Sequence, residues 1–208
     1  MRVKELIINP VSAINDSEIH EIVKQVLDQV MGSPKPGAAQ VNSHAPFEQF
    51  KGNSKGEVRK VIAIGADHGG FDLKEALKGD LTAFGFELND VGTYSKEPVD
   101  YPDVAHEVAK LVASGKAWRG IMIDGAGIGS CIVANKVPGV RAGMAYDVSS
   151  AINSREHNDT NLLTLGGGLI GLNLARQVVK SWLTTEFGGD RHARRVDKIR
   201  SVEKHYLK

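Results

Sequence analysis

A glycine-rich stretch in the middle of the chain carries the residues best suited to chemistry. It reads Met122-Ile-Asp-Gly-Ala-Gly-Ile-Gly-Ser-Cys-Ile-Val-Ala-Asn-Lys136, and it joins an apolar run to a segment compatible with a helix. A strand, a glycine turn and a helix start expose backbone N–H groups, which favour a phosphate or a developing oxyanion. Asp124 places a carboxylate at the end of the predicted strand, where open α/β sheets bind ligands. A tight connection whose glycines only permit close packing would show the same pattern, so both interpretations stay open.

Polar residues also follow two other apolar runs. Asp67 and His68 precede Gly69 and Gly70, and an Asp or His on such a turn can exchange a proton with a sugar hydroxyl. Tyr146 and Asp147 follow a later run and are expected at the same edge of the sheet. An alternative for the first pair is a helix-capping aspartate beside an exposed histidine.

A basic cluster lies near the C-terminus and comprises Arg191, His192, Arg194 and Arg195. Arg191 and Arg195 are four positions apart, so on a helix they would share a face and could together bind a phosphate. The alternative is a solvated helix surface. His157 ends a predicted helix, where a histidine commonly interacts with the helix dipole.

Composition excludes several classes of function. The net charge of +1 does not favour nucleic acid as a partner. The seven histidines are scattered and no Cys/His group has ligand spacing, so no metal is expected. The glycines match neither a P-loop nor a dinucleotide fingerprint after the first strand. No apolar run reaches the ~20 residues of a membrane span, no secretory leader is apparent, and the single Cys131 suits a reducing cytoplasm.

From Lys60 onward, apolar runs alternate with helical patterns. The expected strands span 61–65, 86–91, 119–124, 140–145 and 162–165, and the helices between and after them span 71–84, 103–114, 148–156, 170–185 and 191–205, with a further helical segment after the glycine stretch. Such alternation predicts an α/β fold, a doubly wound parallel five-stranded sheet with helices on both faces.

The N-terminal region is expected to be separate from this domain. After the capping cluster at Asn15 to Ser17, apolar residues follow one helical stripe: Ile19, Ile22, Val23, Val26, Leu27 and Val30. We therefore predict an amphipathic extension over 1–31, a flexible Pro/Gly/Ser-rich linker over 32–58 and the main domain over 59–208. The helix could dock on its own domain or a sister subunit, or it could be an address peptide for another protein.

Several motifs occur together in one order from Lys60 to Glu203. They are Gly65-Ala-Asp-His-Gly-Gly-Phe71, Gly92-Thr93, Asp100-Tyr-Pro102, Gly125-Ala-Gly-Ile-Gly129 with Ala134-Asn-Lys136, Ser154-Arg-Glu-His-Asn-Asp-Thr-Asn161 and Gly189-Asp-Arg-His-Ala-Arg-Arg195. The chain thus resembles the ribose-5-phosphate isomerase B family, which includes the galactose-6-phosphate isomerase subunits. The resemblance implies a flavodoxin-like three-layer sandwich, a homodimer or tetramer with shared active sites, no cofactor, and aldose–ketose isomerisation of a sugar phosphate through a cis-enediolate. Ribose 5-phosphate and ribulose 5-phosphate are the expected pair.

The resemblance also implies roles for single residues. Asp67 and His157 would open the sugar ring and handle its hydroxyls, with His68 nearby, and Asn158 and Tyr101 would contact the sugar. Arg191, His192 and Arg195 would bind the phosphate. The backbone amides from Gly125 through Ala126 and Gly127 to Gly129 would stabilise the enediolate oxygen.

The chain departs from the family at the base that moves the proton between C1 and C2. One branch of the family has a cysteine where this chain has Asp124, and another has a glutamate where it has Ser130. The threonine that often follows the cysteine is Ala126 here. We interpret Asp124 as the base, with Cys131 as second candidate. The alternative is a catalytically silent sugar-phosphate-binding protein or a non-catalytic subunit of a hetero-oligomer.

The N-terminal extension is additional to the family pattern. A short amphipathic helix on a Pro/Gly-rich tether resembles the encapsulation peptides of bacterial microcompartments. This resemblance implies binding to shell proteins through residues 16–31 and a location in the compartment lumen. Without such targeting we expect the cytoplasm.

Overall fold

Five parallel strands form the centre of the domain in this computed structural model, which describes residues 60–206 together with Glu21 and Gln25. They are β1 (Val61–Ala66), β2 (Glu87–Asp90), β3 (Arg119–Asp124), β4 (Ala142–Met144) and β5 (Leu162–Gly166). Their order across the sheet is β2-β1-β3-β5-β4, and every pair is parallel. The predicted α/β class and all five predicted strands are confirmed, with ends that differ by at most a few residues.

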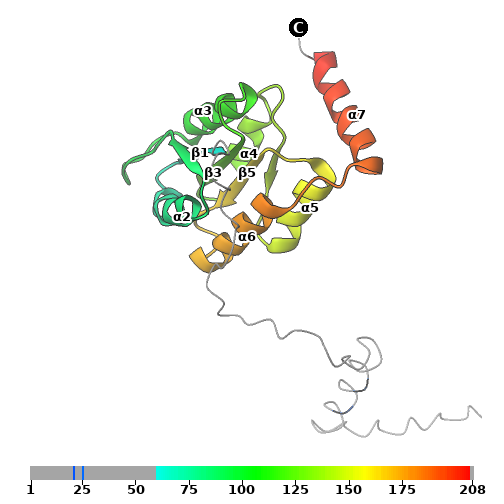
Figure 1. The fold of residues 1–208 in the computed structure, drawn as a ribbon. Coiled ribbons are helices and arrows are strands. Elements are labelled where there is room, and N and C mark those ends of the chain that lie inside the picture. Colours follow the sequence, from blue (N-terminus) through cyan, green and yellow to red (C-terminus); the bar gives the residue numbers. More distant parts are fainter. Residues whose placement is uncertain (1–20, 22–24, 26–59, 207–208) are drawn as a thin grey trace, which may run out of the picture. The chain divides into compact units, whose positions relative to one another are not determined.

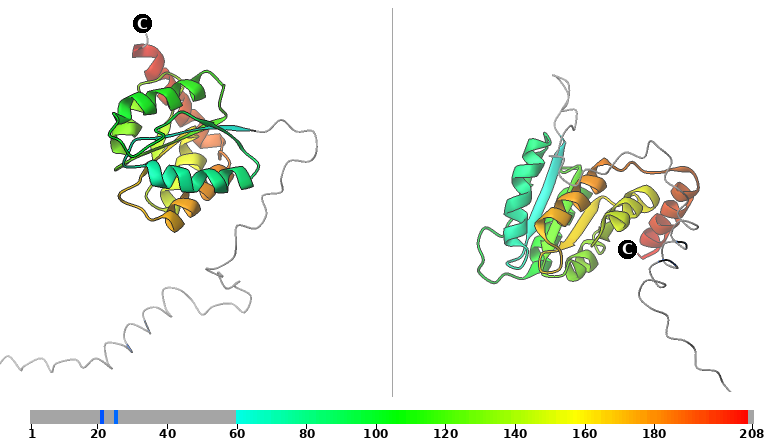
Figure 2. Two further views of the ribbon diagram at one scale, coloured as in Figure 1. Left: turned by 90° about the vertical axis from the view of Figure 1, so that its left-hand side faces the viewer. Right: turned by 90° about the horizontal axis from the view of Figure 1, so that it is seen from below.

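Helices cover both faces of the sheet (Figures 1 and 2). They are α2 (Phe71–Ala83), α3 (Tyr101–Ala113), α4 (Ile128–Ala134), α5 (Val148–Asn158), α6 (Leu172–Thr184) and α7 (Asp190–Tyr206). One core joins alternate side chains of the strands to α2, α5 and α6, and a second core joins the intervening side chains to α3 and α4. Because the inner strands are buried on both faces, they show continuous apolar runs in the sequence.

The strand order differs from the flavodoxin-like order, in which the fifth strand lies at the edge. Here β5 lies between β3 and β4, and all five of its residues are buried. The three residues of β4 are only half-buried, which suits an edge position. As a result the C-terminal ends of β1, β3 and β5 are neighbours, and the loops that follow these strands can meet.

A buried lysine fixes α2 against the end of β2. The Lys74 side chain is fully buried, and its ammonium group lies 2.7 Å from Asp90 Oδ1 and 3.1 Å from the Glu75 carboxylate. Asp90 also accepts hydrogen bonds from Lys78 Nζ at 2.7 Å and the Gly92 amide at 3.0 Å. Burial by itself raises the pKa of Asp90, but the bonds from Lys74, Lys78 and Gly92 outweigh it and hold the pKa below its usual value.

The predictions for the N-terminal region lie largely outside the described residues. Glu21 and Gln25 are helical and exposed, and both belong to the expected amphipathic helix. The rest of that helix and the linker at 32–58 are not described. Among the described helices, none is long and apolar enough to cross a membrane.

Candidate active site

The end of β1 presents Asp67 and His68. The Asp67 amide donates to the Ile123 carbonyl at 3.1 Å, which joins this turn to β3. The Asp67 side chain is 6% exposed, and its Oδ1 accepts from the Gly70 amide at 3.0 Å. No group among the described residues donates to Oδ2, and that atom is not sealed from solvent. His68 is exposed, and its Nδ1 accepts from the Val99 amide at 3.3 Å.

The end of β3 presents Asp124 in a different state. Its side chain is also buried, at 4% exposure. Oδ1 accepts from the amides of Ala126, at 2.8 Å, and Gly127, while Oδ2 accepts from the Ser130 amide at 3.0 Å and from the Ser130 hydroxyl. This carboxylate is therefore surrounded by the loop that follows it.

These contacts divide the amides of the glycine loop into two sets. The amides from Gly125 to Gly129 are predicted to stabilise an enediolate oxygen, but those of Ala126 and Gly127 donate to Asp124 instead. Gly125 and Gly129 keep backbone amides with no acceptor among the described residues. Gly127 has φ +79, in the left-handed region, and a Cβ there would lie 2.9 Å from the Leu165 carbonyl carbon. The loop thus needs glycine both to bend and to approach β5.

Two tyrosines pack against this loop. The Tyr101 ring lies over Gly129, where a Cβ would come within 2.5 Å of it. The Tyr146 hydroxyl donates to the Ala126 carbonyl at 2.7 Å, so the end of β4 reaches the loop as expected. Asp147, by contrast, caps α5 by accepting from the Ser150 amide at 2.8 Å.

A glycine turn after β5, which is not among the predicted site elements, also lies at this end of the sheet. The Gly167 amide donates to the Asp124 carbonyl at 2.7 Å, and the Gly168 amide donates to the Gly125 carbonyl at 3.0 Å. A Cβ at Gly167 would lie 2.6 Å from the Gly69 carbonyl oxygen. The available signal was the run of three glycines at 166–168 directly after a predicted strand.

Other predicted residues gather at the end of α5. The rings of His157 and His192 stack, with centroids 4.1 Å apart and an interplanar angle of 6°. The Asn153 side-chain amide contacts His157 Nδ1 at 2.8 Å. His192 is 7% exposed, its Nε2 accepts from Arg191 Nε at 3.3 Å, and its buried Nδ1 has no partner among the described residues. Desolvation, followed by the nearby His157 and arginines, lowers the pKa of His192.

The predicted phosphate-binding arginines begin α7 beside this histidine pair. Arg191 and Arg195 are both exposed. Neither has a carboxylate partner among the described residues. Two uncompensated guanidinium groups one helical turn apart can bind an anion between them.

The two groups of residues lie at opposite ends of the strands, one at the C-terminal ends and the other near the N-terminal ends. Asp67 and Asp124 stand at the C-terminal ends of β1 and β3. α5 starts after β4 at that end and runs back, so His157 and Asn158 lie near the start of β5 at the N-terminal end. One chain therefore carries the predicted site residues in two separate halves.

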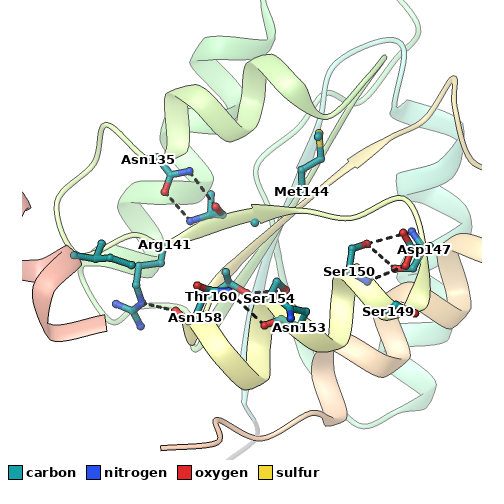
Figure 3. A pocket seen from close by; sticks show the side chains of 13 residues that line it. Asn135, Arg141, Met144, Asp147, Ser149, Ser150, Asn153, Ser154, Asn158 and Thr160 are labelled. Atoms are coloured by element: carbon teal, nitrogen blue, oxygen red, sulfur yellow. Dashed lines mark hydrogen bonds between the residues drawn. The ribbon is translucent and has the colours of Figure 1, made fainter. Parts of the chain in front are cut away.

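A groove of about 720 Å³ follows the exposed side of β4 and α5 between these two ends (Figure 3). Most of the residues that line it have polar side chains, and they run from Asp147 at one end to Arg141 and Asn158 at the other. Arg141 is committed to an ion pair with Asp159 at 2.7 Å. At this edge the Asn135 side-chain amide already pairs with β4, since it donates to the Ala142 carbonyl at 3.0 Å and accepts from the Ala142 amide at 2.9 Å.

The side chain of Cys131, the second candidate base, lies against β4. Its Sγ lies 3.6 Å from the Ala142 carbonyl of β4, and burial raises the pKa of its thiol. The residue is half-buried, and a thiol with a raised pKa forms the thiolate, its basic form, less readily. Within residues 60–206, no three His, Cys, Asp or Glu side chains converge in a way that could hold a metal ion.

Known proteins with similar sequences and structures indicate the family of this chain. The sequence profile of the ribose/galactose isomerase family matches residues 62–199. Ribose-5-phosphate isomerase B of Escherichia coli (strain K12) is 45% identical over 69% of this chain and 97% of its own length. D-erythrulose-4-phosphate isomerase of Pectobacterium atrosepticum is 42% identical over 66% of this chain and 91% of its own. The structure of Clostridium thermocellum ribose-5-phosphate isomerase B matches with a TM-score of 0.70 and 50% identity, covering 71% of this chain and 99% of that one.

Proposed function

The chain belongs to the ribose/galactose isomerase family and is a sugar-phosphate aldose–ketose isomerase, and from that premise we propose that it interconverts ribose 5-phosphate and ribulose 5-phosphate through a cis-enediolate. The observation that carries the proposal is that one chain holds both kinds of group that the reaction needs. Asp67 and the free loop amides lie at the C-terminal ends of the strands, and the unpaired Arg191 and Arg195 lie at the opposite end of the domain. A tetrose 4-phosphate is the second candidate substrate, because one relative is a D-erythrulose-4-phosphate isomerase.

Each group has a task in this reaction. Arg191 and Arg195 bind the phosphate, and His192 supports them through its contact with Arg191. His157, held by Asn153, exchanges a proton with the ring oxygen when the sugar opens. Asn158 and Tyr101 contact sugar hydroxyls. The free amides of Gly125 and Gly129 stabilise the oxyanion of the enediolate.

A second copy of the chain completes the site in this proposal. Asp67 and His157 lie at opposite ends of the strands, so they cannot act on one small sugar within a single chain. The groove beside β4 offers a surface for the partner. A two-fold dimer would bring the His157 half of each chain to the Asp67 half of the other.

Mixing two inactive variants tests the shared site. Asp67→Asn and His157→Asn each disable one half, and a randomly mixed dimer contains hybrids with one intact site. Unfolding and refolding the mixture should restore about a quarter of the wild-type activity for a two-fold dimer. Refolding either variant alone is the control, and failure of the mixture to regain activity would argue against sharing.

The function itself is tested by incubating the protein with ribose 5-phosphate, D-erythrose 4-phosphate and D-galactose 6-phosphate and measuring ketose formation. We expect turnover with the pentose phosphate and a loss of phosphate affinity in Arg191→Ala. If calorimetry detects binding of these sugars while none is converted, the chain is instead a sugar-phosphate-binding protein or the silent subunit of a hetero-oligomer.

The same assay of ketose formation also tests which residue is the base. The family pattern predicts Asp124 as the base, because this residue occupies the position of a catalytic residue in one branch of the family. In its present geometry it could accept a proton only after releasing one of its four hydrogen bonds. Asp124→Asn should abolish turnover if that prediction is right, whereas Cys131→Ala should not.

We also propose that the N-terminal extension directs the enzyme to a microcompartment shell, which would place it in the lumen. Residues 1–58 precede the family match and carry the amphipathic helical stripe between Ile19 and Val30. Deleting residues 1–56 should preserve catalysis but abolish co-sedimentation with shell proteins. An inactive truncation would indicate a structural role, and unchanged co-sedimentation would exclude targeting by this segment.

A further inference from the structure

Asp124 has no free position for a proton. An ionised carboxylate offers about four acceptor positions. Ala126, Gly127 and Ser130 supply four donors to it, two on each oxygen. A residue in this state is well placed to hold a loop in shape and poorly placed to exchange protons during turnover.

Asp67 has such a position. Its Oδ1 is oriented by the Gly70 amide at 3.0 Å, and its Oδ2 has no donor among the described residues. Although the residue is 6% exposed, Oδ2 keeps contact with solvent. A proton can therefore enter and leave at Oδ2 without breaking any hydrogen bond within the protein.

Asp67 also lies close to an uncommitted amide. The position that a Cβ of Gly69 would occupy lies 3.3 Å from Asp67 Oδ1, 3.3 Å from the Gly125 nitrogen and 3.2 Å from the Gly125 Cα. The Gly125 N–H has no acceptor among the described residues. A carboxylate that accepts a carbon-bound proton and an N–H that receives the resulting oxyanion are the two groups that enolisation requires.

His68 adds a proton donor beside them. Because its Nδ1 accepts from the Val99 amide at 3.3 Å, the neutral ring carries its hydrogen on Nε2. That hydrogen is available to a substrate oxygen at the exposed side of the turn.

We propose, building on the isomerase function above, that Asp67 moves the proton between C1 and C2 and that Asp124 is a positioning residue that shapes the glycine loop. Asp67 Oδ2 takes the C2 proton of the open-chain aldose, the C–H electron pair forms the C1=C2 bond, and the carbonyl pair moves onto O1 beside the Gly125 amide. Asp67 then returns the proton to C1 as the C1=C2 pair forms the new C–H bond. At the same time the O2 proton passes to O1 and the O2–H electron pair forms the C2=O2 bond of the ketone, while the His68 Nε2–H donates a hydrogen bond to these oxygens.

The experiment starts from ribulose 5-phosphate, because a 2-ketopentose with its O5 phosphorylated cannot close a furanose ring. Ring opening therefore plays no part, and a residue used only for that step is dispensable. Proton NMR in D2O follows both the loss of the C1 hydrogens and the formation of ribose 5-phosphate. The proteins compared are wild type, Asp67→Asn and Asp124→Asn, each checked for folding by circular dichroism.

Asp67→Asn keeps an oxygen for the Gly70 amide but cannot accept a proton, so both NMR signals should change about 10³-fold more slowly than with wild type. Asp124→Asn keeps a carbonyl oxygen for the Ala126 and Gly127 amides, so its rate should stay within about tenfold of wild type. Turnover by Asp67→Asn near the wild-type rate would overturn the proposal, and so would its abolition in a folded Asp124→Asn.

Ser130→Ala keeps the test decisive if Asp124→Asn does not fold. It frees one position on Asp124 Oδ2, so a base at Asp124 would show a displaced pH–rate profile, whereas a base at Asp67 would leave the profile in place. A displaced profile therefore overturns the proposal. Failure of the proposed isomerase function gives a different result from failure of the Asp67 assignment. Wild type itself would then produce neither NMR change, and the proposal would be overturned together with the function.

Discussion

The ends of β1 and β3 carry the same kind of residue in opposite states. Both Asp67 and Asp124 close a buried parallel strand, and both are almost inaccessible to solvent. Asp67 receives one hydrogen bond from the turn after it, whereas Asp124 receives four from its loop. Two acids at neighbouring strand ends can thus differ in how many of their acceptor positions are occupied. The donors that the following loop presents to each acid decide that number.

The difference arises from the two turns. After β1 the chain enters α2 within a few residues, and only the Gly70 amide points back at the carboxylate. After β3 the left-handed Gly127 curls the loop around Asp124, so that amides from three residues converge on it. A longer glycine-rich loop therefore offers more anion-binding amides, but the protein's own carboxylate uses three of them.

The largest effect should come from Gly70→Ala, which would push the two strand ends apart. A Cβ at Gly70 would overlap the Ile123 carbonyl oxygen, and backbone atoms cannot yield as a flexible side chain can. We expect a loss of about 3 kcal/mol or more in the free energy of unfolding, measured by urea denaturation, and loss of isomerase activity. Gly79→Ala in α2, where nothing lies within 4 Å, is the matched control and should stabilise the protein slightly. If Gly70→Ala and Gly79→Ala were equally stable, Gly70 could not lie as close to the Ile123 carbonyl as the structure indicates.

Lys74→Met should weaken the attachment of α2, the helix after β1, to the end of β2. The methionine fills the volume of the lysine stem but leaves Asp90 with only Lys78 and the Gly92 amide. Removing one partner of a buried ion pair should cost about 3 kcal/mol in the free energy of unfolding. Lys96→Met removes an exposed pair with Asp72 and should cost less than about 1 kcal/mol. Similar costs for both variants would show that burial of Lys74 contributes nothing.

Ser130→Ala acts on the other strand end and should have a smaller effect. It removes the hydroxyl donor to Asp124 from a fully buried position, which should lower the free energy of unfolding by about 2 kcal/mol. Isomerase activity should persist, because the Asp67 turn is untouched. Ser201→Ala, on the exposed face of α7, is the control and should be nearly neutral. Loss of activity in a stable Ser130→Ala would show that the β3 end does more than shape the loop.

The smallest effect concerns the acid side of the pH–stability curve. Because the folded protein lowers the pKa of Asp90, its contribution is present above the unfolded pKa of about 3.9 and is lost as the pH falls through the folded value. The stability difference between wild type and Lys74→Met should therefore shrink below about pH 4. A difference that stays constant from pH 7 to pH 3 would contradict the link between Asp90 and Lys74.

Local patterns were sufficient for much of this molecule. Apolar runs, helical stripes and glycine turns predict all five strands and most helix limits, because secondary structure depends mainly on residues close in the chain. The motifs also single out Asp67, His157 and the arginines of α7. The strand order was not predictable in this way, and neither were the contacts of the glycine turn after β5 with the end of β3, since both depend on which strands pair across the sheet.

The sequence by itself determined the class of fold, the acids at the strand ends and the basic start of the last helix, because residue type and spacing are local properties. Only the tertiary structure decided that β5 lies next to β3, that His157 is remote from Asp67 within one chain, and that Asp124 is occupied by its own loop. These outcomes depend on the directions of N–H groups and on contacts between distant segments. A linear pattern does not encode such directions, whereas packing and hydrogen bonding impose them.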